Sequence, residues 1–267
     1  MQANVLDLEG NPIGKIELPK VFEEPIRKDL ILRAVLASQS NRRQPYGPDS
    51  MAGKRTSADY HGVRRTRYSM MGKEMARLPR LHGKTVPFLM MRARFVPQAV
   101  GGRRAHPPLV EKVWEKKINK KEKRKAIRSA LAATAIKGLV AERGHQVQDI
   151  KEFPIIVDDK LQELKKTKDV VQFLKKIGLG KELERISERK IRAGKGKARS
   201  RKYKIKVGPL FIVTNDNGID KAVRNLSGCG VCKVEKLSAE DLAPGASIGR
   251  LVVYTRSSIE KLKQFGQ

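Results

Sequence analysis

The sequence is short of several residue types, and each shortage narrows the possible functions. Only two cysteines are present in 267 residues, Cys229 and Cys232, so no disulfide framework forms and a reducing compartment is expected. No apolar run approaches the roughly 18 residues that a membrane-spanning helix needs. The first residues lack the basic and then apolar segments of a signal peptide. We therefore expect a soluble, cytoplasmic protein that does not insert into membranes.

Acidic residues are also scarce, with 28 Asp and Glu against 58 Lys and Arg, which gives a formal net charge of +30. Three segments hold 27 of these 30 excess charges. Residues 46–108 carry 13 basic and 3 acidic side chains, residues 109–144 carry 11 and 4, and residues 189–206 carry 10 and none. The rest of the chain is nearly neutral. A charge this large and this localised predicts a polyanionic partner, with nucleic acid as the first candidate.

Short apolar runs alternate with amphipathic segments outside the basic regions. The expected strands are two in a hairpin at 4–18, then 153–157, 209–214, 230–237 and 250–255. The expected helices are 26–37, 119–143 (Asn119 as cap with Glu122, Gly144 as stop), 169–178, 218–226 and 257–265 (Ser257 or Ser258 as cap). This alternation predicts an α/β fold, a three-layer sandwich with a mainly parallel four-stranded sheet. The hairpin and first helix, residues 1–45, are expected to pack onto this body, residues 109–267.

Residues 46–108 fit neither a helix nor a strand, because seven glycines and six prolines interrupt them. A loop of this length without structure of its own is unusual in a compact domain. Arginines dominate it, and Tyr60, Tyr68, Phe88 and Phe95 are interleaved with them. Arginine pairs with phosphates and stacks on bases, so the segment is typical of a loop that folded RNA orders. No amphipathic helix with a coherent apolar face favours a membrane surface instead.

Residues 189–206 form a second basic segment inside the chain. A charge run is usually a solvated patch, and that interpretation stays open. However, the run lies between two predicted core elements, so both of its ends are anchored. Small residues let its backbone approach a phosphate chain, and Tyr203 offers a face for stacking. We therefore favour nucleic-acid contact.

Motifs for catalysis or metal binding are weak. The Cys229–Cys232 pair leads into a strand, whereas a redox dithiol needs a helix N-terminus, and a structural zinc site needs four ligands. The glycine-basic stretches lack the spacing of a phosphate loop. Three of four histidines, His61, His82 and His106, lie in the basic loop. We expect no enzyme, no cofactor and no metal.

Several stretches together carry a family resemblance: "LPKVFEEPIRKDLI", "AGKRTSADYHG", "RFVPQAVGGRRAHPP", "AIRSALAATA", "KIRAGKGKARSRKY", "RNLSG" and "DLAPGASIGRL". In these the chain resembles the family of the universal large-subunit ribosomal protein number four, in its archaeal form. The resemblance implies an α/β body on the outer ribosome surface and a long loop threaded through large-subunit rRNA. It also implies early assembly, no enzymatic activity, and a loop tip that helps line the nascent-peptide exit tunnel opposite another protein's long hairpin.

The stretch between His61–Gly62 and Arg92 is longer and more apolar than the resemblance leads us to expect, and we place the tip around residues 66–84. The expected partners are rRNA, neighbouring ribosomal proteins and the passing nascent peptide. The expected RNA-binding residues are Lys54, Arg55, Arg64, Arg65, Arg67, Lys73, Arg77, Arg80, Arg92, Arg94, Arg103, Arg104, Lys190, Arg192, Lys195, Lys197, Arg199, Arg201, Lys202 and Tyr203. The alternatives are a free-standing nucleic-acid-binding protein or RNA chaperone, and an enzyme that uses the cysteine pair.

Overall fold

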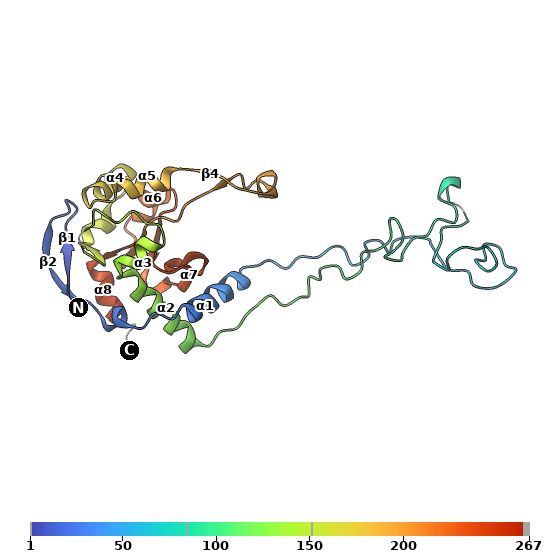
Figure 1. Cartoon of the computed structure of the whole chain (residues 1–267), viewed down its shortest axis with the longest axis horizontal. Coiled ribbons are helices and arrows are strands. Elements are labelled where there is room, and N and C mark those ends of the chain that lie inside the picture. The colour runs from blue at the N-terminus through green and yellow to red at the C-terminus, as the bar shows by residue number, and fades with distance from the viewer. Residues whose placement is uncertain (1, 84, 151, 264–267) are drawn as a thin grey trace. The chain divides into compact units, whose positions relative to one another are not determined.

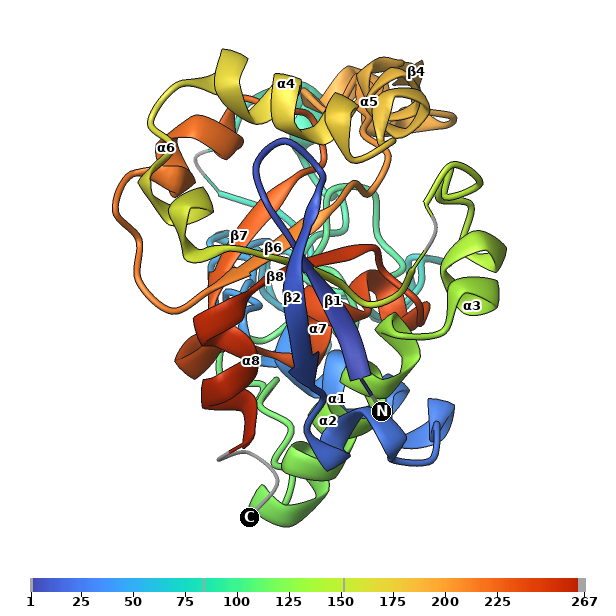
Figure 2. The ribbon, with the colours of Figure 1, turned by 90° about the vertical axis from the view of Figure 1, so that its left-hand side faces the viewer.

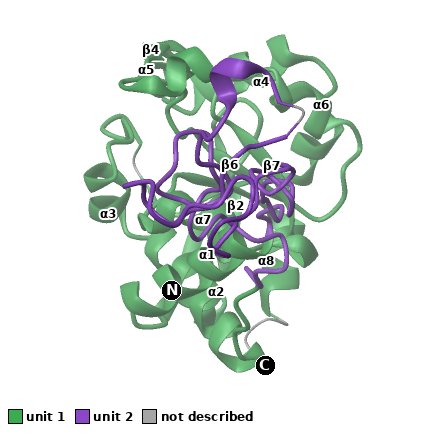
Figure 3. Cartoon of the chain, turned by 90° about the vertical axis from the view of Figure 1, so that its right-hand side faces the viewer, with its two compact units in different colours: residues 1–41, 115–267 green, residues 42–114 purple. Residues whose placement is uncertain are grey.

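The structure, a computed structural model, describes residues 2–83, 85–150 and 152–263 (Figure 1). The chain divides into two compact units. We call residues 1–41 with 115–267 the body and residues 42–114 the loop unit (Figure 3). Residues 42–45 and 109–114, which sequence analysis assigns to the flanking segments, fall within the loop unit.

The body is built on one mostly parallel sheet of six strands in the order β2-β1-β3-β8-β6-β7. Its strands are β1 (Gln2–Leu6), β2 (Pro12–Glu17), β3 (Ile155–Val157), β6 (Leu210–Val213), β7 (Gly230–Lys233) and β8 (Val252–Thr255). The predicted α/β class is confirmed, but the sheet has six strands instead of four. The reason is that β1 of the N-terminal hairpin pairs in parallel with β3, matching Val5 to Ile156. The hairpin therefore extends the sheet as well as packing beside it.

Two hydrophobic cores lie on the two faces of this sheet, and the strands alternate between them. Ile212 and Tyr254 face one core, whereas Phe211 and Val253 face the other. The helices are α1 (Lys28–Asn41), α2 (Lys120–Thr134), α3 (Lys137–Glu142), α4 (Thr167–Lys176), α5 (Gly180–Ser187), α6 (Ile219–Arg224), α7 (Ala239–Leu242) and α8 (Arg256–Leu262). Helices α1, α2, α7 and α8 cover the first core and α3, α4 and α6 the second (Figure 2).

The expected helix at 119–143 is two helices, because the chain breaks between α2 and α3. Asn119 does occupy the N-cap position of α2, but its side chain makes no capping hydrogen bond. Glu122 instead forms an ion pair with Arg33 of α1 at 3.1 Å. Gly144 ends α3 with a φ of +97° and donates its N–H to the carbonyl of Ala141 at 2.8 Å.

The expected cap of α8 was also misplaced. Thr255 is the N-cap residue, while Ser257 donates to Asp159 at 2.6 Å and Ser258 donates to the Thr255 carbonyl at 2.6 Å. The two serines thus serve contacts within the body. Residues 264 and 265 of the expected helix lie outside the described residues.

The packed pair α1 and α2 brackets the loop unit in the sequence. The backbone N–H of Arg27 donates to the Ser129 hydroxyl at 2.6 Å, which joins the start of α1 to α2. At the other end, the Lys116 N–H donates to Asn41 at 2.8 Å. The places where the chain leaves the body for the loop unit and returns from it are therefore hydrogen-bonded to each other within the body.

Candidate nucleic-acid interface

The loop unit makes a small structure of its own without regular strands or α-helices in its described residues. Isolated bridges join Asp59 to Arg80 and Arg80 to Ala93, and one short 3-10 helix covers Pro87–Leu89. Met70 and Leu81 are only 2% and 8% exposed. The sequence had no periodic signal for this fold, because single bridges and turns leave none.

An aromatic cluster lies beside these buried residues. The Tyr68 ring stacks on His82 with ring centres 4.9 Å apart and planes 16° apart. The Nε2 atoms of His61 and His82 are 2.6 Å apart, and the Arg67 guanidinium lies 5.0 Å from the Tyr68 ring centre. The cluster fixes residues from two distant parts of the loop unit against each other.

A second aromatic cluster closes the neck of the loop unit, where its two ends meet. Tyr46 stacks on Trp114 with ring centres 5.9 Å apart. The Arg43 guanidinium lies 3.8 Å from the Trp114 ring centre, and the Lys112 ammonium lies 4.5 Å from it. Cations on an indole face are favourable contacts, so the neck is held by stacking and charge together.

Some expected RNA-binding residues of the loop unit already have partners inside it. Arg80 donates to the carbonyls of Met91 at 2.8 Å and Ala76 at 3.0 Å, and Arg94 donates to Val100 at 2.6 Å. Arg55 pairs with Asp49. The pKa of Asp49 lies below its ordinary value because the Met51 N–H and then Arg55 bind its carboxylate.

The other expected residues of the loop unit are available at its surface. The exposed ones are Lys54, Arg64, Arg65, Arg67, Lys73, Arg77, Arg92 and Arg104, and Arg103 is half-buried. Three of them line one cavity of about 580 Å³ at the neck: Lys54, Arg103 and Arg104. The chain can approach itself there because Gly53 has a φ of +74° and an added Cβ would lie 2.5 Å from the Arg103 Cα.

The segment 189–206 is an ordered β-ribbon, which we call the basic hairpin. Its strands β4 (Lys190–Ile191) and β5 (Tyr203–Lys204) pair antiparallel around a 3-10 turn at Lys195–Arg199. Arg192 braces it, since its Nε donates to the Arg201 carbonyl at 3.1 Å. An added Cβ on Gly196 would lie 2.9 Å from the Arg192 Cδ, so the glycine makes room for this side chain.

The remaining expected residues of the basic hairpin are exposed. They are Lys190, Lys195, Lys197, Arg199, Arg201, Lys202 and Tyr203. The Lys202 ammonium lies 5.5 Å from the Tyr203 ring centre. Exposed cations of the kind that pair with phosphate and one exposed ring are thus presented together, while Arg192 braces the backbone.

A buried polar network at the root of the basic hairpin was not predicted from the sequence. The Leu251 N–H donates to Nε2 of His145 at 3.3 Å, and Nδ1 of His145 donates to Glu182 at 2.7 Å. Arg185 donates to Glu182 at 2.7 Å and to the Val207 carbonyl at 2.6 Å. The network ties α5 to the segment that follows the basic hairpin. Sequence analysis did not predict α5. The segment is rich in charged residues, and nothing in the sequence indicates that one of them, Glu182, is buried.

Burial and hydrogen bonding set the charges of this network. Burial lowers the pKa of His145 and favours the neutral ring. Burial opposes the charged form of Glu182, but hydrogen bonds from Arg185, His145 and the Gln146 N–H hold its pKa below the ordinary value. At neutral pH, a neutral His145 therefore lies beside the ion pair of the Glu182 carboxylate and the Arg185 guanidinium.

The cysteine pair has no reactive geometry. Cys232 lies in β7 and Cys229 directly before it, neither at a helix N-terminus. Burial raises the pKa of each thiol to about 12, so both stay protonated at neutral pH. Among residues 2–83, 85–150 and 152–263, no group of three His, Cys, Asp or Glu side chains is placed to hold a metal ion. In the same residues, no helix has the length and apolar character to cross a membrane.

Comparison with known proteins gives consistent results along the chain. The model of the "Ribosomal protein L4/L1 family" matches residues 16–265. The chain is 48% identical over 265 residues to the large ribosomal subunit protein uL4 of Methanopyrus kandleri, covering 99% of this chain and 98% of that one. It is 47% identical to the protein of the same name from Methanosphaera stadtmanae, covering 97% and 95%. The corresponding protein of Halobacterium salinarum is 46% identical, covering 99% and 100%.

Proposed function

Because this chain belongs to the ribosomal protein L4/L1 family, we propose that it is a structural constituent of the large ribosomal subunit, in the cytoplasm, that binds large-subunit rRNA. The family is structural and not enzymatic, and the chain is not an enzyme. The finer claims that follow concern which parts of the chain touch the RNA and what they do there.

The observation that carries the proposal is the placement of the uncompensated charge. Exposed cations are dense on the loop unit and on the basic hairpin, and the hairpin segment 189–206 has no acidic residue. A further exposed group lies around the start of α2, at Lys116, Lys117, Lys120, Lys121, Lys123, Arg124 and Lys125. The loop unit and the basic hairpin both hold their backbone with internal contacts and leave most cationic side chains outside. Phosphate contacts of this kind supply affinity and fix the register of a protein on RNA. We assign the loop unit as the part that penetrates the rRNA and the basic hairpin as a second contact.

We further propose that the loop unit helps line the nascent-peptide exit tunnel. Its compact part, held by the bridges from Asp59 to Ala93, overlaps the expected tip at 66–84, of which residue 84 lies outside the described residues. A self-held tip supports this role because a tunnel wall needs a fixed shape. The partners there would be the passing nascent peptide and a neighbouring protein with its own long hairpin. Early joining of the assembling subunit follows from a loop that later RNA would enclose.

A sedimentation experiment tests the proposal. Lysate is washed with high salt, run on a sucrose gradient and probed for this chain. We expect it to remain with the large subunit, because a loop enclosed by RNA does not dissociate when salt screens the surface charges. Release to the top of the gradient would contradict the structural role and favour a free-standing RNA chaperone.

A further inference from the structure

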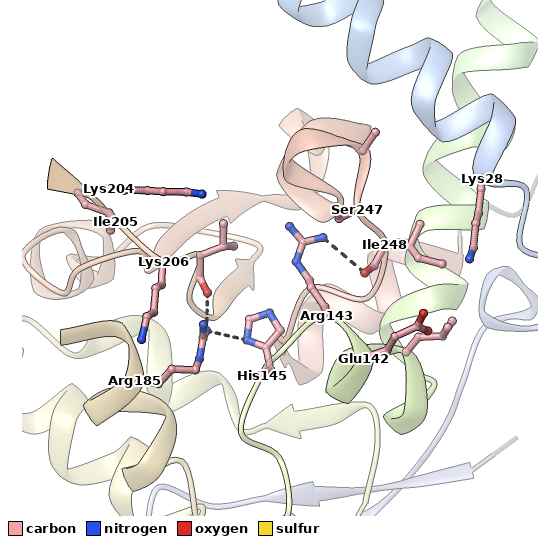
Figure 4. Close-up of a pocket in the computed structure, with 13 residues that line it drawn as sticks. Lys28, Glu142, Arg143, His145, Arg185, Lys204, Ile205, Lys206, Ser247 and Ile248 are labelled. Atoms are coloured by element: carbon pink, nitrogen blue, oxygen red, sulfur yellow. Dashed lines mark hydrogen bonds between the residues drawn. The ribbon is translucent and has the colours of Figure 1, made fainter. Parts of the chain in front are cut away.

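A cationic pocket of about 610 Å³ lies on the body (Figure 4). We call it the body pocket. Its lining contains none of the individually expected RNA-binding residues, although Lys204, Ile205 and Lys206 belong to the basic segment 189–206. Its basic lining comes from elements far apart in the sequence: Lys28 of α1, Arg143 after α3, Arg185 of α5, Lys204 of β5 and Lys206 just beyond it. The volume falls within the range of ordinary small-ligand sites.

Charge in the body pocket is only partly compensated. Arg185 is paired with Glu182 at 2.7 Å and Lys206 with Glu188 at 2.6 Å. Lys28, Arg143 and Lys204 have no acidic partner among the described residues, and Glu142 is the single acidic residue of the lining. Three cations therefore face one carboxylate in a preformed hollow.

Arg143 is the most constrained of these cations. Its guanidinium donates to the carbonyls of Pro244 at 2.9 Å and Ile248 at 3.4 Å, which fixes its position without neutralising it. Burial, together with the positive charges of Arg250 and Arg185, lowers its pKa to about 10. A guanidinium held among like charges, with carbonyls as its only partners in the described chain, is suited to an incoming anion.

The position of the pocket indicates which anion. Lys204 belongs to the basic hairpin, so an RNA backbone that follows the hairpin reaches the pocket at its root. Leu139, Ile205 and Ile248 give the pocket apolar walls suited to a ribose or base. Resting on the proposed rRNA-binding function, we propose that the body pocket binds one phosphate of the RNA backbone with its adjoining nucleoside. Arg143 contacts this phosphate, and Lys204 and Lys28, which lie on opposite sides of Arg143 (Figure 4), attract the backbone that flanks it.

The test uses the two lysines, because neither braces the fold in the described structure. Full-length wild type, Lys28→Gln, Lys204→Gln and the double variant are titrated with a large-subunit rRNA transcript at several KCl concentrations. Lys160→Gln, an exposed lysine of the body outside the pocket, is the matched control. Arg64→Gln/Arg65→Gln reports on the loop unit separately. Circular dichroism melting checks that each variant folds.

Each single pocket variant should make the negative slope of log K against log salt shallower by about 0.7–0.9 and weaken binding by about fivefold at 0.15 M salt. The double variant should change the slope by about twice as much. Lys160→Gln should match wild type. If the pocket variants also match wild type while Arg64→Gln/Arg65→Gln weakens binding, the pocket proposal is overturned and the rRNA-binding function stands. If wild type itself does not bind the transcript, the proposed function fails with it.

A second titration separates RNA from a free anion as the source of the phosphate. Inorganic phosphate is added to wild type and to Lys28→Gln/Lys204→Gln, and binding is followed by calorimetry. Phosphate binding that disappears in the double variant while rRNA affinity is unchanged would assign the pocket to a free anion and overturn the proposal. Loss of rRNA affinity in the same variant supports it.

Discussion

The body and the loop unit differ in what holds them in shape. Every strand of the central sheet but the edge strand β2 contributes to two apolar cores, and residues such as Leu174 and Phe211 are fully buried. In the described loop unit, Met70 and Leu81 are the only buried apolar side chains. The loop unit relies on carbonyl-bound arginines, stacked rings and bridges. From this apolar burial we expect the body to be stable alone, and we expect the loop unit to need a partner to complete its structure.

Removal of residues 60–95 should give the largest effect, and it should affect rRNA binding without unfolding the body. The deletion takes away the exposed cations Arg64, Arg65, Arg67, Lys73, Arg77 and Arg92. We expect affinity for large-subunit rRNA to fall roughly 10³-fold or more, because about six phosphate contacts are lost. The body should keep a cooperative thermal transition by circular dichroism. Loss of that transition would show that the loop belongs to the core and would break the comparison.

A pair of leucine substitutions measures the same contrast in stability. Leu174→Ala in α4 should lower the free energy of unfolding by about 2–5 kcal/mol, since it leaves a cavity in a closed core. Leu81→Ala in the loop unit should leave the main unfolding midpoint in urea unchanged. An equal effect of the two substitutions would mean that the units unfold together.

Acid should destabilise the body through its buried network. The pKa of His145 and that of Glu182 lie below their ordinary values in the folded chain, so the unfolded chain takes up protons at higher pH. His145 makes its full contribution to the free energy of unfolding above its unfolded pKa of about 6.5, and this contribution declines as the pH falls below that value. The contribution of Glu182 declines at lower pH, below its unfolded pKa of about 4.3. Urea midpoints between pH 8 and 4 measure this.

The histidine part of this dependence has a matched control. His145→Gln should flatten the decline between pH 7 and 5, while His106→Gln, exposed in the loop unit, should leave it unchanged. A decline that persists in His145→Gln would assign the acid sensitivity to other groups of the body.

The smallest effect is expected at the cysteine pair. Cys229→Ser should leave rRNA affinity unchanged and shift the unfolding midpoint only slightly, because a protonated, partly buried thiol takes no part in binding. Alkylation of native protein at pH 7.5 should be slow for both thiols. Loss of a cellular function in Cys229→Ser with rRNA affinity intact would revive the redox interpretation.

Sequence reasoning predicted the body well where one residue pattern determines one element. The buried strands 153–157, 209–214 and 250–255 are continuous apolar runs, and the structure confirms all three. It failed where the answer depends on contacts distant in the sequence. The pairing of β1 with β3 and the ion pair that takes Glu122 away from Asn119 have no local signal.

The candidate interface shows the same division. Charge counting marked the segments that form the loop unit and the basic hairpin, because an excess of cations can be read from the sequence without knowledge of the fold. It could not tell which arginines already have partners. Arg80, Arg94 and Arg192 donate to backbone carbonyls, whereas Arg77, Arg92 and Lys190, which are close to them in sequence, are exposed. The body pocket was also missed, since its cations come from four separate elements.

The neck of the loop unit gives the protein a built-in optical reporter. Trp114 is the single tryptophan of the chain, so all indole emission arises where Tyr46, Arg43 and Lys112 surround one ring. Emission wavelength and quenching follow the polarity and charge around an indole. If RNA phosphates drew the two cations away, or a base replaced the tyrosine, the emission would change at that point alone. Trp114 fluorescence could therefore follow the time course of RNA binding at the neck in unlabelled protein. No attached dye would then alter the RNA-binding surface.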